Sequence, residues 1–228
     1  MTSTVVPRTA VRRWGAGTAA VVRLLVASEV PLTGVAIAAA VGVTQPRVSQ
    51  VLSQLATHHA VAAVDDGYVG DPDVLLDLYR TRARPHLAVP ETYWYSTRPP
   101  TDQADRLVET ATEEQISIAF SADLAPDLLA PWRHPTATVV YADQPLVLDD
   151  AGFVPAEGRA DASIIVRWTS DPRLLSPAPP WPDEIDGLPL VDPCQQWWDL
   201  LDLGGEDRAE AAARLRGAII SRRLANAP

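Results

Sequence analysis

The chain has 228 residues, of which 47% are apolar, so it can bury a sizeable core as one large domain or two smaller ones. Its net charge is −10, and a protein this acidic does not attract nucleic acid as a whole. Its one cysteine, Cys194, excludes an intrachain disulfide and a multi-cysteine metal site, as is typical of a reducing compartment. No apolar run reaches the length of about 18 residues that a membrane span needs, and arginines interrupt the first seventeen residues, unlike in a signal peptide. We therefore expect a soluble, cytoplasmic protein.

Positive charge is concentrated at the amino-terminal end of the chain. Residues 1–64 contain five arginines and one acidic residue, Glu29, and so carry a net charge of +4, whereas residues 65–228 carry −14. Between Val30 and Val64 there is no Asp or Glu. Because a DNA-binding surface needs local positive charge even on an acidic protein, the first 64 residues are the part expected to contact nucleic acid.

Three consecutive helices are expected in this positively charged part. The first covers residues 18–27 and the second residues 33–40. Gly42 lies where the second helix must end, and a glycine there can adopt the left-handed conformation without a Cβ clash. Thr44 can then cap the third helix, and Pro46 falls in its first turn, where a missing N–H costs little.

The third helix, residues 44–55, has two different faces. Its apolar residues recur with helical spacing and form a stripe that should be buried: Val48, Val51, Leu52 and Leu55. The other face carries short polar side chains and one arginine, which are typical of a helix that lies in the DNA major groove. The predicted DNA-contacting residues of this helix are Thr44, Gln45, Arg47, Ser49, Gln50, Ser53 and Gln54.

Within this set Arg47 and Gln50 are the best candidates for reading bases, whereas Gln45 and Ser49 are expected to touch phosphate or the groove wall. The alternative is a helix-turn-helix used only for packing or dimerisation. His58 and His59 end the helix, and they could contact phosphate or form a solvated helix end.

A hairpin and a basic arm complete the predicted DNA-binding part. Two short apolar runs within residues 59–70 flank Asp65-Asp66-Gly67, which is a strong signal for a hairpin turn. A hairpin directly after a recognition helix is a wing, so residues 1–70 are predicted to form a winged helix-turn-helix domain. Its acidic tip should not press closely on phosphate. Arg12 and Arg13 could reach phosphates or a minor groove as an arm, the alternative being a solvated tail.

Beyond residue 70 the pattern becomes a mixture of helices and strands. Residues 71–100 are predicted as a connector helix, ending before Pro85, followed by an aromatic strand at 91–96. Residues 101–228 are predicted as a C-terminal α/β domain closed by helices, which makes the fold class mixed α+β. The expected helices are 102–114, 124–129, 194–203 and 206–224, and the expected strands are 116–120, 136–142, 145–150 and 162–168.

Signals for catalysis are poor. The chain has neither a glycine-rich phosphate loop nor an H-E-x-x-H motif, and its four histidines do not follow the spacing of a zinc site. Acid clusters such as Asp149-Asp150 are expected to be solvated. We therefore predict that the protein is not an enzyme and that it has no cofactor and no metal.

Four segments carry a likeness to a known family: TQPRVSQVLSQL (44–55), SADLAPDLLAPWRHPT (121–136), VVYA (139–142) and above all LVDPCQQWWDLLDLGGEDRAEAAARLR (190–216). Together with the order of elements, they make the chain resemble the AbiEi family of antitoxins and transcriptional regulators of type IV toxin–antitoxin systems. The C-terminal segment is the more specific part, because winged helices are common to many regulators.

The resemblance implies a repressor of its own operon, which binds double-stranded DNA at repeats in its promoter and could do so as a homodimer. It also implies a C-terminal domain involved in antitoxicity. The partner would be a nucleotidyltransferase toxin, which a type IV antitoxin counters without a stable complex. The alternative hypothesis is a protein-interaction module, in which the acidic C-terminal domain binds a basic partner and the winged helix is a docking surface.

Overall fold

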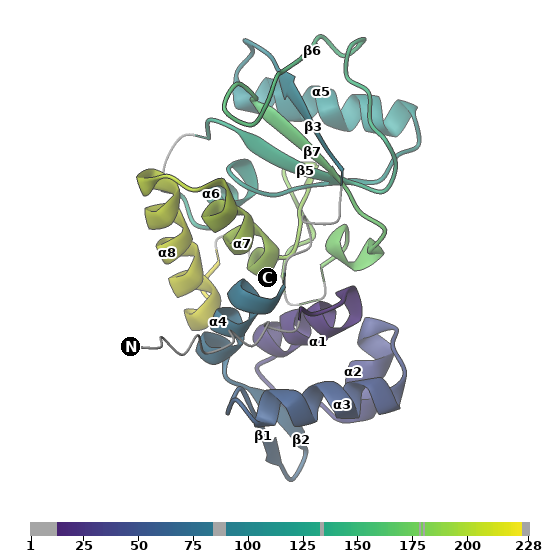
Figure 1. Ribbon diagram of the computed structural model, residues 1–228, viewed down its shortest axis with the longest axis vertical. Coiled ribbons are helices and arrows are strands. Elements are labelled where there is room, and N and C mark those ends of the chain that lie inside the picture. Colours follow the sequence, from purple (N-terminus) through teal and green to yellow (C-terminus); the bar gives the residue numbers. More distant parts are fainter. Residues whose placement is uncertain (1–12, 84–89, 133–134, 178, 180, 225–228) are drawn as a thin grey trace, which may run out of the picture.

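The computed structural model describes residues 13–83, 90–132, 135–177, 179 and 181–224. Helices and a mixed β-sheet make up the molecule, with three helices and a hairpin at one end and the larger sheet at the other (Figure 1). The predicted fold class, mixed α+β, is confirmed. None of the described helices combines the length and apolar character that crossing a lipid bilayer would require.

The amino-terminal elements follow the predicted order. They are α1 (Ala16–Ala27), α2 (Gly34–Val41), α3 (Gln45–Ala56), β1 (Val61–Val64) and β2 (Gly67–Gly70), with β1 and β2 paired antiparallel. Gly42 follows α2 in the left-handed conformation, with a φ of 68°, as the sequence predicts. At the hairpin turn, a Cβ on Gly67 would lie 2.6 Å from the backbone of Leu32, so only glycine fits there. The turn is thereby held against the segment that precedes α2.

Two threonines at the starts of these helices behave differently. The Thr33 hydroxyl accepts a hydrogen bond of 3.1 Å from the Ala36 amide and caps α2. Thr44 is the N-cap residue of α3, but its hydroxyl caps none of the described amides of that helix. Thr44 therefore occupies the predicted N-cap position, but the prediction that its side chain caps the helix is wrong. The start of α3 depends instead on Pro46, whose φ is already helical.

The remaining elements form the larger part of the molecule. Its helices are α4 (Pro72–Arg82), α5 (Pro100–Glu113), α6 (Leu124–Leu129), α7 (Pro193–Leu203) and α8 (Glu206–Ser221), with a 3-10 turn at Pro172–Leu174. Its strands are β3 (Glu91–Tyr95), β4 (Ile118–Phe120), β5 (Thr138–Ala142), β6 (Val154–Pro155), β7 (Ile164–Trp168), β8 (Glu184–Ile185) and β9 (Leu188–Pro189). The sheet has the order β4-β5-β7-β3-β6, in which only β5 and β7 pair in parallel; β8 and β9 form a separate hairpin.

Both faces of this sheet are covered. Val140 of β5 belongs to the same core cluster as Leu107 of α5, whereas the next residue, Tyr141, packs with Ile165 and Val191 in a second cluster. Burial on both faces explains why the central strands are apolar along most of their length rather than alternating.

One predicted strand is wrong. Residues 145–150 form an irregular segment and a turn, not a strand. The alternation that suggested a strand is real, because Leu146 and Leu148 are buried while Val147 is exposed. These leucines are fixed by packing into the core, without a ladder to a neighbouring strand. The edge position beside β3 is occupied instead by β6, which pairs through Val154 and Pro155.

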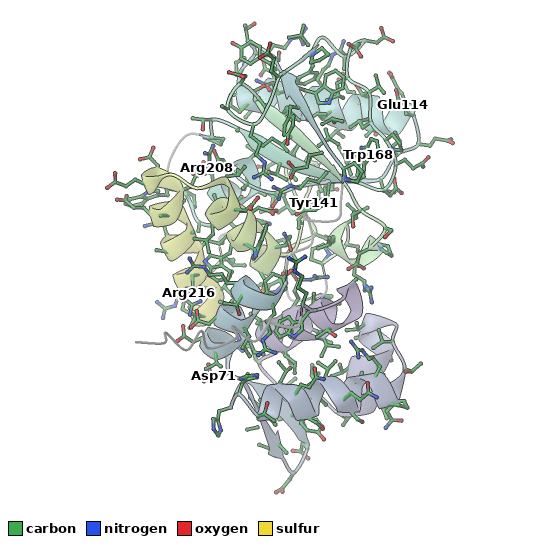
Figure 2. The ribbon with its side chains drawn as sticks, in the orientation of Figure 1. Asp71, Glu114, Tyr141, Trp168, Arg208 and Arg216 are labelled. Carbon is green, nitrogen blue, oxygen red and sulfur yellow. The ribbon has the colours of Figure 1, made fainter. Side chains whose placement is uncertain are left out.

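The two ends of the molecule are in contact through α4, which packs against α1 on one side and against α7 and α8 on the other (Figure 1). Arg216 lies on α8 (Figure 2). It reaches α4 and pairs with Asp73 at 2.7 Å and with Asp77 at 3.1 Å. Arg173 donates a 3.0 Å hydrogen bond to the Val41 carbonyl at the end of α2. The amino-terminal helices are thus attached to the sheet-bearing part at several separate points.

Candidate nucleic-acid interface

Helix α3 presents a polar face to solvent. Its apolar stripe, Val48, Val51, Leu52 and Leu55, is buried as predicted. The predicted DNA-contacting residues of this helix are all exposed: Thr44, Gln45, Arg47, Ser49, Gln50, Ser53 and Gln54. The structure thus places them on one accessible face, because the apolar stripe fixes the rotation of the helix against α1 and α2.

The two residues predicted to read bases are in contact with each other. Arg47 donates a 2.8 Å hydrogen bond to the hydroxyl of Thr18 on α1 and a longer one, 3.5 Å, to the side-chain oxygen of Gln50. Thr18 is buried, so it holds one edge of the guanidinium at a fixed place beside α1. Sequence reasoning missed Thr18, since the contact joins two helices and nothing local to α3 signals it.

Arg13 and Arg47 carry the exposed positive charge near α3, whereas Arg23, another arginine of the first 64 residues, is buried beside Asp171 and Asp192. The one acidic residue of the first 64, Glu29, pairs at 3.5 Å with Arg222, which follows α8. Asp65 and Asp66 lie exposed at the tip of the hairpin. Arg13 is exposed ahead of α1, whereas Arg12, the other residue of the predicted arm, lies outside the described residues. The acidic side chains closest in sequence are thus held away from the polar face of α3 or confined to the hairpin tip.

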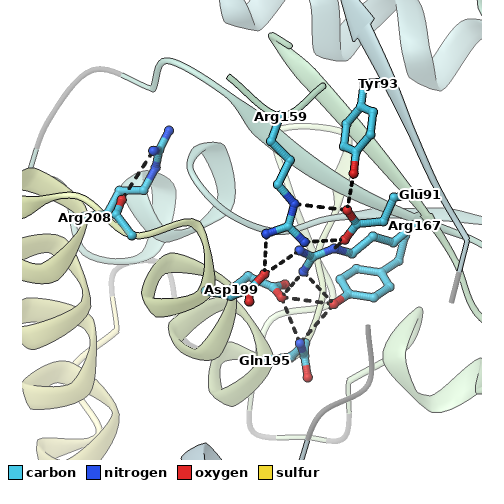
Figure 3. A network of polar contacts seen from close by, with 10 residues as sticks. Glu91, Tyr93, Arg159, Arg167, Gln195, Asp199 and Arg208 are labelled. Carbon is cyan, nitrogen blue, oxygen red and sulfur yellow. Dashed lines mark hydrogen bonds and ion pairs between the residues drawn. The ribbon is translucent and has the colours of Figure 1, made fainter. Parts of the chain in front are cut away.

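The strongest cluster of charges lies elsewhere, beneath the sheet (Figure 3). Arg167 of β7 has no exposed surface and donates to three carboxylates: to Asp199 at 2.5 Å, to Asp202 at 2.8 Å and to Glu91 at 2.9 Å. Arg159 bridges Glu91 and Asp202 from the other side. The network thereby ties α7 to strands β3 and β7.

Asp199 is the centre of this network. Besides Arg167, it accepts hydrogen bonds from Ser121 at 2.5 Å, from Tyr141 at 3.0 Å and from Gln195 at 3.0 Å. Burial raises the pKa of Asp199, although the charge of Arg167 and these hydrogen bonds oppose the shift. Burial also raises the pKa of Tyr141 well above its ordinary value, so the phenol stays protonated and donates.

The centre of this cluster is closed to solvent. The side chains of Arg167 and Asp199 are both fully buried, so a substrate cannot reach the charged pair. Across the described ranges, no group of three or more His, Cys, Asp or Glu side chains is arranged to hold a metal ion. The polar groups of the network satisfy one another, as buried charges must.

A second buried chain of polar groups joins this network to α1. Arg23 of α1 donates to the Tyr79 hydroxyl at 3.3 Å, and Tyr79 donates to the Gln195 side-chain oxygen at 2.7 Å. The guanidinium of Arg23 also lies 3.7 Å from Asp171 and 3.9 Å from Asp192. Hydrogen bonds therefore run from the amino-terminal helices through α4 to the centre of the sheet-bearing part.

The chain was compared with protein-family models, with curated proteins and with solved structures, and no match was found in any of the three.

Proposed function

We propose that this chain is a sequence-specific DNA-binding transcriptional regulator. In this proposal the three helices and the hairpin act as a winged helix-turn-helix, and α3 enters the major groove with Arg47 and Gln50 toward the base edges. The observation that carries the proposal is the division of α3 into a buried apolar stripe and an exposed, acid-free polar face, within a chain whose positive charge gathers in the same segment.

The resemblance of residues 44–55 and 190–216 supports a more specific form of the proposal. The regulator would be an AbiEi-like antitoxin that represses its own operon from promoter repeats and counters a nucleotidyltransferase toxin without a stable complex. The segment 190–216 corresponds to α7, most of α8 and the three residues between β9 and α7. Such a regulator acts on DNA in the cytoplasm, is not an enzyme, and could bind paired repeats as a homodimer.

The test is a gel shift and a footprint of the pure protein on the DNA upstream of its own gene, against scrambled DNA at physiological salt. We expect a protected direct or inverted repeat. Gln50→Ala should weaken specific binding by about 1–3 kcal/mol, because it removes a predicted bidentate base contact. Gln144→Ala is the matched control, since Gln144 is an exposed glutamine in the loop after β5.

The opposite result would favour the interaction-module hypothesis. Equal affinity for upstream and scrambled DNA, together with recovery of a stoichiometric basic partner in a pull-down, would move the function to the acidic part of the chain. A footprint that persists unchanged in Gln50→Ala would retain the regulator and remove Gln50 as a base reader.

A further inference from the structure

A hollow of about 410 Å³ opens between the start of α1, one side of α3 with the residues that follow it, and the end of α4. Its volume falls within the range of small-molecule sites, about 300–1,000 Å³. It is lined by Arg13, Trp14, Gly15, Thr18, Arg47, Gln54, Thr57, His58 and Arg82. Three arginines and a histidine thus surround one space, and none of the described residues that line it is acidic.

The three arginines of the hollow lack an acidic partner. Among the residues that the structure describes, no carboxylate lies within ion-pair distance of Arg13, Arg47 or Arg82. The described arginines that do pair with a carboxylate are Arg23, Arg106, Arg159, Arg167, Arg173, Arg208, Arg216 and Arg222. The hollow therefore concentrates positive charge that the protein itself does not neutralise.

A hydroxyl and an imidazole ring, not carboxylates, hold two of these arginines in place. Arg47 donates to the Thr18 hydroxyl at 2.8 Å, and Nη2 of Arg82 lies 2.9 Å from Nε2 of His58. Each guanidinium is thus oriented by one edge while its charge stays uncompensated. A guanidinium carries five N–H donors in a rigid fork that matches the oxygens of a phosphate group.

The first turn of α1 adds to the positive electrostatic potential of the hollow. Gly15 is the N-cap residue of this twelve-residue helix; none of the described side chains caps it, and its first turn contains no acid. The amide groups at the start of a helix are not used by the helix itself, and they favour an anion. Because Gly15 and Thr18 both line the hollow, this helix end borders the space that the arginines surround.

We propose that this hollow is a phosphate-binding site, with Arg47 and Arg82 as the principal ligands. The phosphate group belongs either to the backbone of a bound duplex or to a free phosphorylated small molecule. In the first case the inference rests on the proposed DNA-binding function, because the hollow shares Arg47 and Gln54 with the exposed face of α3. It then reassigns Arg47 from a base edge to a phosphate, and Gln50 remains the proposed base reader. In the second case it stands without that function.

The central variant is Arg82→Gln. Arg82 lies outside the predicted DNA-reading face, is half-buried, and supplies its backbone carbonyl to the Trp14 amide at 3.0 Å, a bond that the substitution keeps. Arg98→Gln is the matched control, since it removes the same charge from an exposed loop between β3 and α5. Equal melting temperatures of the three proteins would show that the fold is intact.

One arm of the experiment uses no DNA. The full chain is titrated with inorganic phosphate, pyrophosphate and ATP by calorimetry at constant ionic strength, with chloride as the reference anion. We expect at least one phosphate-bearing ligand to bind, and Arg82→Gln to weaken its binding about 10- to 100-fold through loss of a charge-assisted hydrogen bond. Arg98→Gln should bind as the wild type does.

The other arm uses the footprinted duplex with a single neutral methylphosphonate placed at each backbone position in turn. If the hollow holds a DNA phosphate, one position will weaken binding of the wild type and of Arg98→Gln but not of Arg82→Gln. An Arg82-dependent effect in the anion titration alone identifies a free ligand, and an effect in the methylphosphonate series alone identifies a DNA phosphate. An effect in both arms identifies a site that both kinds of phosphate can occupy. If no duplex is bound, the first arm decides, and absence of an Arg82-dependent effect in every arm performed overturns the proposal.

Discussion

Arg167 has a side chain with no exposed surface in the middle of an apolar strand. Removing a guanidinium from water is costly, and the cost is offset only if its donors meet acceptors of opposite charge. Glu91, Asp199 and Asp202 supply those acceptors at distances between 2.5 and 2.9 Å. The strand tolerates Arg167 for this reason, and each partner in turn depends on it.

We predict that Arg167→Met lowers the free energy of unfolding by about 3–5 kcal/mol, because it leaves the buried charge of Asp199 uncompensated. Urea denaturation measures the change. The control is Arg106→Met, which breaks an exposed pair with Glu109 on α5 and should cost at most about 1 kcal/mol. Similar losses for the two variants would mean that the buried network does not stabilise the fold more than a surface pair does.

Glu91 gives this network a pH dependence. Burial alone would raise the pKa of Glu91, but the hydrogen bonds from Arg159 and the charge of Arg167 outweigh it, and the pKa lies below its ordinary value of 4.5. A carboxylate with a lowered folded-state pKa stabilises the fold fully above the unfolded-state value. That contribution is lost as the pH falls through the folded-state pKa.

We therefore expect the difference in unfolding free energy between the wild type and Glu91→Gln to be constant near neutral pH and to shrink below about pH 5. Denaturation curves at several pH values measure it. Burial raises the pKa of Asp192 and of Asp199, which has the opposite effect on the pH dependence of stability. Both residues are present in the wild type and in Glu91→Gln, so their contributions largely cancel in the difference between the two proteins. If the difference in unfolding free energy widened on acidification, the lowered pKa of Glu91 in the folded state would be contradicted.

At the scale of single elements, the patterns that predicted correctly were local. The stop at Gly42 and the stripe from Val48 to Leu55 depend on neighbours within one or two turns, so the sequence alone contains them. The segment 145–150 shows the limit, since alternating burial does not reveal whether a partner strand is present. The charged network shows the same limit of sequence-based prediction. Glu91 lies beside Arg167 only because β3 and β7 pair in a particular register.

One signal for the network was nevertheless present in the sequence. A lone arginine in the apolar run IIVRW must either reach solvent or find acids inside the protein. Asp199 and Asp202 on α7 are spaced so that both can point to one side of that helix. What the sequence could not give is the pairing of strand and helix that brings these residues together.

The two threonine positions allow a direct test at this scale. Thr33→Ala should lower the free energy of unfolding by about 1 kcal/mol, because the Thr33 hydroxyl caps α2. Thr44→Ala should change it much less, because within the described part of the chain that hydroxyl makes no capping bond. Thermal and urea unfolding of the two exposed variants measure the contrast. Equal losses would show that Thr44 caps α3 in solution.

At the scale of the whole molecule, charge is divided between the two ends of the chain. If Arg12, Arg13, Arg47 and Arg82 each contact a DNA phosphate, the logarithm of the binding constant should fall with the logarithm of salt concentration with a slope of about −4 per protomer. Gel shifts between 50 and 300 mM salt, about the range over which such slopes are measured, give this value. A slope near zero would rule out the proposed electrostatic contacts.

The hydrogen-bonded chain from Arg23 through Tyr79 to Gln195 has a consequence for how this protein can be divided. A fragment that ended at residue 83 would keep Arg23 and lose both of its acids, Asp171 and Asp192, together with Gln195. The fragment would leave Arg23 without its acids and expose apolar surface of α4. Exchange of this amino-terminal segment with that of another protein, by recombination or by engineering, would therefore need matched changes on α7 and in the segment before it.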